Sequence, residues 1–429
     1  MRIMSKSIFS KCTPEGGPAG RLSDRKTEFT TGFSTNFYVD IGGYKSKILS
    51  TQYFRPGTLS STQTLSRHTN KNERYIFYEK LLKSSYLHII PSINPDGFET
   101  RYLINRRDGP YSFSNSRDFV EGRYNLNGVD LNRNFPDLSE LIYYDKDLSK
   151  PDRSRLYNDT FFEKFFVQNL MTQTNSNGNW VNYNSENENY SSGPSSDKLK
   201  INHSSQNNKI LTSETRLTMN YLKNNIFDFM INFHDGAKVV SYPLDKYPLG
   251  GNEYAKSKDD ILIKKLARSY ADEHLNFFNS QNDPSCISGS FDNGITNGAD
   301  WYSLGGGFQD YSYLRYGTIH LTVEANCHKF SDESKLPTLI EDNKPALLNF
   351  LDVATGEVVL VIGKSSTPNS EISFQLLNSG DDRTWIISNS DKDFRKGLSA
   401  KGNYRIFEGS AVRVDNIYLN FGVNKLVDF

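Results

Sequence analysis

The chain alternates between strand-like and helix-like patterns of apolar residues as far as about residue 353. YLHIIPSI at 86–93 is a β-branched apolar run, which predicts a strand, and NPDG at 94–97 predicts a turn after it. IFDFMINF at 226–233 predicts a second strand. GTIHLTVEA at 317–325 alternates apolar and polar residues, so it predicts a strand with two different faces.

Four stretches predict helices: 72–85, 213–225, 257–278 and 344–354. The second of them begins at Ser213 but lacks a full capping box, and the last has Pro345 in its first turn. Strands that alternate with helices predict an α/β fold, a mixed sheet flanked by helices. The short β-like pieces in 355–429, separated by Gly, Ser and Asn, predict a small antiparallel β domain.

Two segments carry little apolar periodicity. Residues 1–71 are rich in Ser, Thr and Gly and form an atypical N-terminal segment, and 138–212 is an Asn/Ser-rich polar insertion. We therefore expect an α/β domain at 72–353 that carries this insertion, and a β domain at 354–429.

The charge balance excludes some partners. Lys plus Arg and Asp plus Glu are 50 each among the 429 residues, which leaves no electrostatic footprint for nucleic acid. No apolar run approaches the roughly 20 residues of a transmembrane helix, so we expect no membrane span. The printed N-terminus is basic but has no continuous apolar segment, so we see no signal peptide in this chain.

The three cysteines, Cys12, Cys286 and Cys327, are too few for a disulfide scaffold. A bridge between Cys286 and Cys327 and three free thiols are both compatible with the sequence. Acceptor triplets for N-glycosylation begin at Asn158 and at two further positions, Asn189 and Asn202, and are a weak indication of secretion.

Five ordered stretches carry candidate chemistry: SINPDGFE (92–99), GRYNLNGVDLNRNFPD (122–137), FHDGAKVVSYPLD (233–245), GITNGADWYSLGGGFQDYSYL (294–314) and HLTVEANCHKF (320–330). In this order and spacing they resemble the zinc carboxypeptidases, specifically the regulatory subfamily of carboxypeptidases D, E, M and N. The resemblance covers 72–137 and 213–353, and the tail resembles the transthyretin-like β sandwich that follows the catalytic domain there.

The resemblance implies how a peptide C-terminus would be held and cut. Asn132 and Arg133 would bind the terminal carboxylate, which suits an amide beside a bidentate guanidinium. Arg123 would polarise the scissile carbonyl, and Tyr302 would close over the bound end. Glu324 would act as general base and then as general acid, and it lies on the strand face opposite the apolar residues.

The resemblance also implies a metal ligand and a specificity pocket. His234 would bind zinc, Asp245 would lie at the base of a pocket that selects Lys or Arg, and Gln309 would line that pocket. Each residue alone has an ordinary structural interpretation. Asp245, for example, could form a weak loop ion pair with its neighbour Lys246.

The zinc site departs from the family pattern. The family takes two ligands from one His-x-x-Glu motif, yet none of the seven histidines has Glu three residues on, and only His234 matches a ligand. His68 and Glu73 are five residues apart, which does not place both on one helix face. Asp235 also stands where the family has a glycine after the histidine.

These observations leave three interpretations. The chain is an incomplete version of a zinc-dependent carboxypeptidase that removes C-terminal Lys or Arg in the secretory pathway. Alternatively, it is a non-catalytic pseudo-peptidase that binds C-terminal carboxylates through Asn132 and Arg133. A third class, an adhesion or scaffold protein that uses the β domain, has no support beyond the tail.

The missing motif predicts that the purified chain does not retain zinc, because one ligand cannot hold a catalytic metal. Elemental analysis after dialysis measures the stoichiometry, and we expect far less than one zinc per chain. About one zinc per chain would mean that other residues complete the site.

Overall fold

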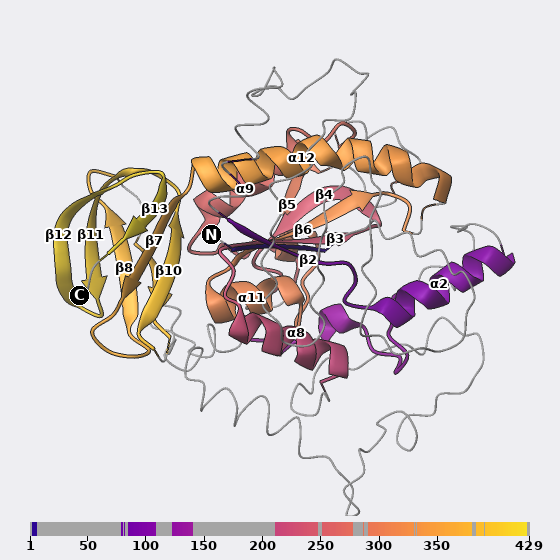
Figure 1. Ribbon diagram of the computed structural model, residues 1–429, viewed down its shortest axis with the longest axis horizontal. Helices are drawn as coiled ribbons and strands as arrows, with labels where there is room; N and C mark the ends of the chain where they lie inside the picture. Colours follow the sequence, from indigo (N-terminus) through magenta and orange to yellow (C-terminus); the bar gives the residue numbers. More distant parts are fainter. Residues whose placement is uncertain are drawn as a thin grey trace, which may run out of the picture.

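The computed structural model describes residues 2–6, 79, 81, 85–108, 122–139, 211–247, 251–277, 286, 291–329, 331, 333–379, 383–389 and 391–426. Within these residues a six-stranded sheet lies between layers of helices, and an all-β region follows it in sequence and lies at one side (Figure 1). The predicted fold class, a mixed sheet flanked by helices with a C-terminal all-β region, is confirmed.

The large sheet has six strands, and one of its two central strands is buried along its whole length. Its strands are β1 (Arg2–Lys6), β2 (Tyr86–Ile90), β3 (Phe229–His234), β4 (Ala237–Tyr242), β5 (Ile295–Asn297) and β6 (Ile319–Asn326), in the order β2-β1-β3-β6-β4-β5. All neighbours are parallel except β4 and β6. All eight residues of β6 are buried, as expected for a strand inside a layered α/β fold.

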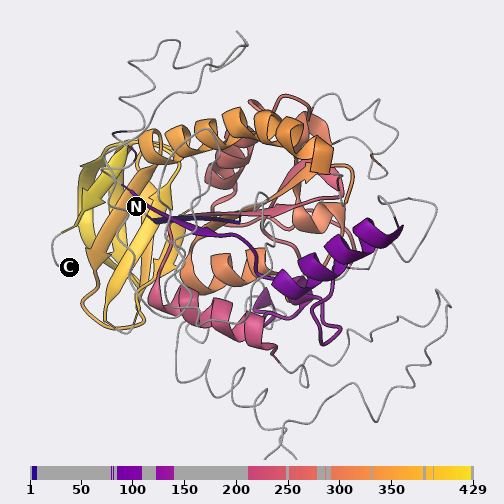
Figure 2. The same ribbon diagram turned by 45° about the vertical axis from the view of Figure 1, so that its right-hand side comes forward.

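Helices cover both faces of this sheet. They are α2 (Pro95–Asp108), α8 (Ser213–Asn224), α9 (Asp260–Ala271), α10 (Gly298–Trp301), α11 (Phe308–Tyr316) and α12 (Leu336–Gly356), with short 3-10 turns η1 (Leu131–Arg133), η5 (Asp292–Gly294) and η6 (Glu333–Lys335). Both views place α9 and α12 on one face and α8 and α11 on the other (Figures 1 and 2). Much of the core is aromatic, and the rings of Phe229 and Phe350 meet edge to face with centroids 6.4 Å apart.

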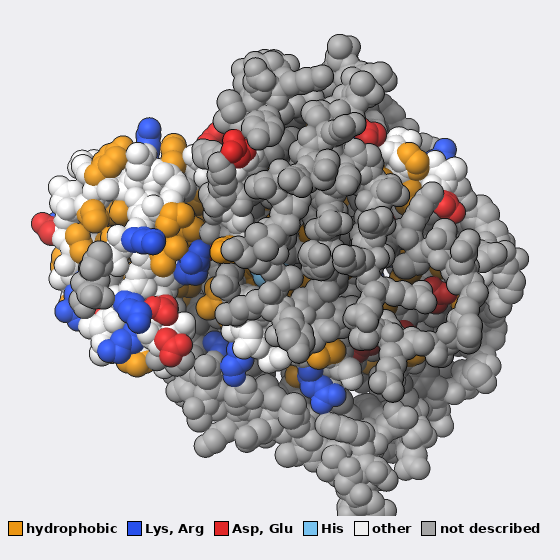
Figure 3. Space-filling model, viewed as in Figure 1, with side chains coloured by type: hydrophobic (Ala, Val, Ile, Leu, Met, Phe, Trp, Pro, Cys, Tyr) orange, Lys and Arg blue, Asp and Glu red, His pale blue; other side chains and the backbone are white. Residues whose placement is uncertain are grey.

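The C-terminal region consists of two small sheets around their own core. Its strands are β7 (Val359–Lys364), β8 (Glu371–Leu376), β9 (Thr384–Ile387), β10 (Asp393–Leu398), β11 (Gly402–Glu408), β12 (Ala411–Leu419) and β13 (Gly422–Lys425). The sheets have the orders β10-β7-β13 and β12-β11-β8-β9. The antiparallel prediction is correct for most pairs and wrong for β13, which runs parallel to β7. The exposed face of this region mixes basic, acidic and apolar side chains (Figure 3).

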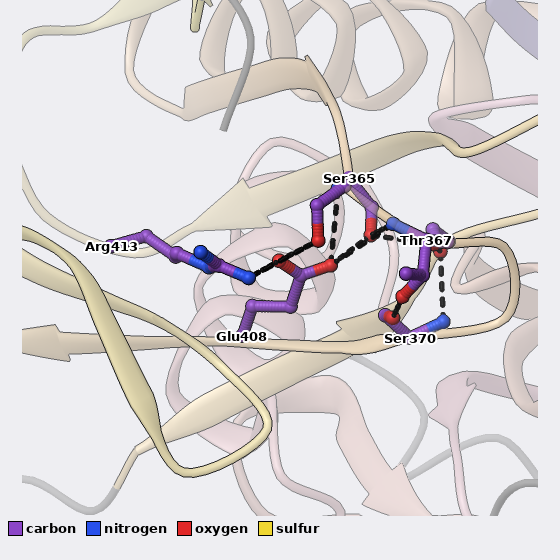
Figure 4. A network of polar contacts seen from close by, with 7 residues as sticks. Ser365, Thr367, Ser370, Glu408 and Arg413 are labelled. Atoms are coloured by element: carbon purple, nitrogen blue, oxygen red, sulfur yellow. Dashed lines mark hydrogen bonds and ion pairs between the residues drawn. The ribbon is translucent and has the colours of Figure 1, made fainter.

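A buried carboxylate fixes the loop between β7 and β8. Glu408 accepts hydrogen bonds from the hydroxyls of Ser365 and Ser366 and forms an ion pair with Arg413 at 2.8 Å (Figure 4). Burial by itself raises the pKa of Glu408, but these hydrogen bonds outweigh it and lower the pKa to about 2. The carboxylate therefore stays charged and holds the loop against β11.

Charged groups join the β region to the helices and sheet. Both carboxylate oxygens of Asp259, which precedes α9, accept from the Lys396 ammonium of β10 at 2.6 Å. Asp259 also accepts from Thr384 of β9 at 2.6 Å and from Tyr313 of α11 at 2.9 Å. A second pair is bidentate, with both Arg395 contacts to Asp228 at 2.8 Å.

Most predicted elements are confirmed, and one predicted turn is wrong. The strands expected at 86–93, 226–233 and 317–325 are β2, β3 and β6, and the helices expected at 213–225 and 257–278 are α8 and α9. NPDG is the first turn of α2, because Pro95 suits the first helical position and the Asn94 side chain accepts from the Gly97 amide at 3.1 Å.

Three further details differ from the predictions. Helix α12 begins at Leu336, so Pro345 lies inside the helix rather than in its first turn. Thr212, not Ser213, caps α8, because its side chain accepts from the Thr215 amide. Within the atypical N-terminal segment, for which no element was predicted, β1 forms a strand between β2 and β3.

Some predictions fall largely outside the described residues. The helix at 72–85 is described only at Glu79, Leu81 and Ser85, and only the ends of the 138–212 insertion are described. The three glycosylation triplets lie outside as well, and the predicted domain boundaries stay predictions.

Cys286 and Cys327 form a disulfide, with Cα atoms 4.7 Å apart, which confirms the bridged alternative for this pair. In the described part of the chain, no helix combines the length and apolar character that crossing a membrane requires.

Replacing Lys396 by Met should lower the free energy of unfolding by about 3 kcal/mol, because it leaves the buried Asp259 carboxylate without its cation. The side chains of Lys396 and Asp259 are only 2% and 5% exposed. Urea unfolding measures the change. Arg405→Met is the matched control, since the Arg405–Asp415 pair is 38% and 75% exposed and should contribute less than about 1 kcal/mol. Equal losses in the two variants would contradict a special role for Asp259.

Candidate active site

The predicted site residues gather at the carboxyl ends of β3 and β6. The parallel register of these strands places His234 directly opposite Glu324. Ligands of open α/β sheets bind at this edge, where the strands end and the loops begin. The loops that carry the other predicted residues are connected to this edge and to one another by the contacts that follow.

The Asn-Arg pair lies on a turn that is held against α11. Asp130 caps this turn by accepting from the Asn132 amide at 3.1 Å, and the Asn132 side-chain oxygen accepts from the Phe308 amide at 2.8 Å. Gly306 approaches the turn so closely that a β-carbon there would lie 2.7 Å from the Arg133 carbonyl oxygen. Asn132 and Arg133 are thus positioned by the start of α11.

Arg123 is fixed by the same acid that caps this turn. Its Nε and Nη2 atoms lie 2.8 and 2.6 Å from one oxygen of Asp130. Burial lowers the pKa of Arg123, but the Asp130 charge more than compensates, and the pKa is raised overall. The Arg123 carbonyl accepts from the Asn94 side chain at 3.1 Å, so the NPDG stretch and the GRYNLNGVDLNRNFPD stretch meet here.

Tyr302 lies beside Arg133 at the open side of the site. It is 39% exposed, and the Arg133 guanidinium carbon lies 5.9 Å from the centre of its ring. Burial and the Glu324 charge raise the pKa of Tyr302, while Arg133 opposes the rise. Tyr302 therefore stays a protonated hydrogen-bond donor at neutral pH.

Asp245 is a buried acid in a cradle of glycines. It accepts from the Gln309 side chain at 2.8 Å. A β-carbon at Gly298 would collide with the Asp245 carboxylate, and one at Gly307 would lie 3.1 Å from it. Burial raises the pKa of Asp245 to about 7, although Arg133 and Gln309 act to lower it.

Lys246 and the neighbouring Asp245 have different partners in the structure. Lys246 pairs with Asp137 at 2.8 Å. The Asp245 backbone is fixed from the other side, because its amide donates to both carboxylate oxygens of Asp310 at 2.9 Å. Asp310 was not singled out from the sequence, where it is one acid among 50.

Glu324 is buried near the carboxyl end of β6, opposite His234. Within the described part of the chain, its Oε2 atom has no hydrogen-bond partner. Burial raises the pKa of Glu324 to about 7, and the positive charges of Lys329, Arg123 and Arg133 act against that rise. Two of these cations were predicted as site residues, whereas Lys329 was not.

The described residues do not fit a catalytic zinc. They contain no group of three or more His, Cys, Asp or Glu side chains that could hold a metal ion. The Nε2 atom of His234, the predicted ligand, lies 2.7 Å from the Asn232 side-chain nitrogen. The structure brings His234 and Glu324 together, but the residues that it describes supply no two further ligands beside His234.

Comparison with known proteins shows the family to which the chain belongs. A family model described as zinc carboxypeptidase matches residues 62–346. The chain belongs to this zinc carboxypeptidase family. The predicted resemblance to the regulatory subfamily is confirmed by the relatives that follow.

The human carboxypeptidase N catalytic chain is 32% identical over 289 residues, which are 66% of this chain and 50% of that one. Carboxypeptidase E of Caenorhabditis elegans is 30% identical over 386 residues, 84% of this chain and 67% of that one. This chain thus spans about half the length of carboxypeptidase N. Among solved structures, thrombin activatable fibrinolysis inhibitor is 16% identical over 65% of this chain and 53% of that chain, with a TM-score of 0.37, too low to add support.

Replacing Glu324 by Gln in this zinc carboxypeptidase family member should flatten the pH dependence of stability between pH 4.5 and 7. The folded pKa of about 7 lies above the ordinary 4.5. This carboxyl therefore contributes stability below pH 4.5 that is lost as the pH rises to 7, about 3 kcal/mol in all. Urea unfolding across this range measures the difference from the unmodified chain. The exposed Glu99→Gln variant is the control. An unchanged pH profile in Glu324→Gln would contradict the raised pKa of the Glu324 carboxyl.

Proposed function

We propose that this site binds the C-terminal residue of a peptide or protein and prefers Lys or Arg. The observation that carries the proposal is the buried Asp245 carboxylate in its glycine cradle, held by Gln309. A buried acid is costly unless a cation meets it. A guanidinium or ammonium from the ligand would meet this need, whereas an apolar side chain would not.

The terminal carboxylate is assigned to Arg133, with Asn132 beside it. Arg133 acts electrostatically on both Asp245 and Glu324, so its positive charge lies within range of the pocket and of the predicted general base. A ligand with a basic side chain and a free carboxylate has the complementary charges at this spacing. Tyr302 beside Arg133 is proposed to close over this end of the ligand.

We assign binding without hydrolysis to the chain as printed. The family consists of peptide hydrolases, but the donors that the described residues place around His234 do not fit zinc. A second candidate function, hydrolysis of the same C-termini, is favoured by the buried Glu324 beside Arg123, since a pure binding site needs no general base. The two candidates share one ligand class and differ only in whether the last peptide bond is cut.

Titration with fluorescent peptides tests the proposal. A peptide ending in Arg should bind at least about tenfold more tightly than one ending in Phe, because only Arg neutralises Asp245. Amidation of the Arg peptide should weaken binding by a similar factor, because it removes the carboxylate that Arg133 would hold. Asp245→Asn should abolish the preference for Arg over Phe.

The exposed Asp415→Asn variant serves as the control and should keep the preference. Equal affinity for the Arg and Phe peptides would overturn the proposed specificity. Mass spectrometry of the Arg peptide after incubation with added zinc decides between the two candidates, since release of free arginine would establish hydrolysis.

A further inference from the structure

The Lys329 ammonium and the Glu324 carboxylate both border Gly236, close in the chain to the predicted metal ligand. A β-carbon placed on Gly236 would lie 3.6 Å from the Lys329 Nζ atom and 4.0 Å from Glu324 Oε2. Gly236 comes two residues after His234, and the strand register sets His234 opposite Glu324. Lys329 therefore borders the part of the site that the family resemblance assigns to zinc.

The position of Lys329 is fixed by the elements around it. It follows the end of β6, two residues after Cys327, whose disulfide ties this segment to Cys286. The turn before β4 closes on the same strand end, because the Gly236 amide donates to the Asn326 carbonyl at 2.7 Å. The lysine thus reaches the site from a segment that is held on both sides.

The charges near Lys329 are mainly negative. Glu324, Asp130 and Asp235 stabilise its ammonium, whereas burial and the Arg123 charge act against it and lower its pKa overall. Of the three cations that lower the pKa of Glu324 against the effect of burial, Lys329 has the largest effect. The acid and the lysine thus stabilise each other's charge in a desolvated region, where an isolated charge of either sign is costly.

We infer that Lys329 is the resident cation of this site, and that the chain engages a peptide C-terminus through Lys329 instead of through a divalent metal. This inference rests on the proposed function and deepens it. An ammonium carries three donors, so it can serve the Glu324 carboxylate and a carbonyl oxygen of the ligand together. A metal ion in the same space would be repelled by this ammonium.

Different charges of the site would meet the C-terminal residue of the ligand and the peptide carbonyl before it. Arg133 acts on both Asp245 and Glu324, and Lys329 acts on Glu324. Free arginine is complementary to Asp245 and Arg133 but has no peptide carbonyl to present to Lys329. An acetylated Ala-Arg dipeptide has that carbonyl, so Lys329 should contribute to its binding and not to that of arginine.

The test compares the affinities of these two probes for the full chain in EDTA. Lys329→Met should weaken dipeptide binding by about tenfold, because a charge-assisted hydrogen bond is lost, and should leave arginine binding within about twofold. Lys329→Arg should restore most of the dipeptide affinity. Lys425→Met, on the exposed end of β13, is the control and should change neither.

The inference is overturned if Lys329→Met binds the dipeptide as tightly as the unmodified chain does in EDTA. It is also overturned if the unmodified chain binds the dipeptide only when zinc is added. The proposed function fails separately, if Asp245→Asn leaves the affinity for arginine unchanged. Loss of arginine binding together with dipeptide binding in Lys329→Met would also count against the inference, because it would mean a general structural role.

Discussion

The parallel pairing of β3 with β6 is the constraint on which the site depends. It sets His234 and Glu324 opposite each other, although they are distant in sequence. The loops at this sheet edge then reach a common region, with Arg123 fixed by Asp130 and the Asn132–Arg133 turn held by the start of α11. The strand register thus determines which strand residues lie opposite each other. The contacts of the loops then hold Arg123, Asn132 and Arg133 in place.

Local patterns predicted the elements wherever one physical signal dominated. The apolar run of β3 and the alternating pattern of β6 each matched one kind of strand. NPDG failed because the same residues that favour a turn also start a helix: Asn94 caps and Pro95 fits the first position. Strand β1 was missed because a five-residue segment with two polar ends carries little periodicity, and its pairing with β2 and β3 comes from tertiary contacts.

The site residues that could be predicted from the sequence are those that lie within the family motifs. Asp245 and Gln309 could be singled out in advance, and the structure brings them within 2.8 Å. Asp310 and Lys329 could not be singled out in advance. Asp310 matters because it binds the amide of Asp245, which is remote in sequence, and Lys329 because it lies close to Gly236. No local pattern separates such residues from the other acids and lysines of the chain. The departure at the zinc site was visible because a missing motif can be read directly from the sequence.

Helix α11 connects the pocket with the β region. Gln309 in its first turn holds Asp245, and Tyr313 in its last turn donates to Asp259, the acid that also receives Lys396 and Thr384 from β10 and β9. The β region is therefore a structural partner of the pocket and not an interchangeable appendage. A chimaera that exchanged this region for one from a relative would need to supply matching donors for Asp259, or the helix that orients the pocket would lose its second anchor.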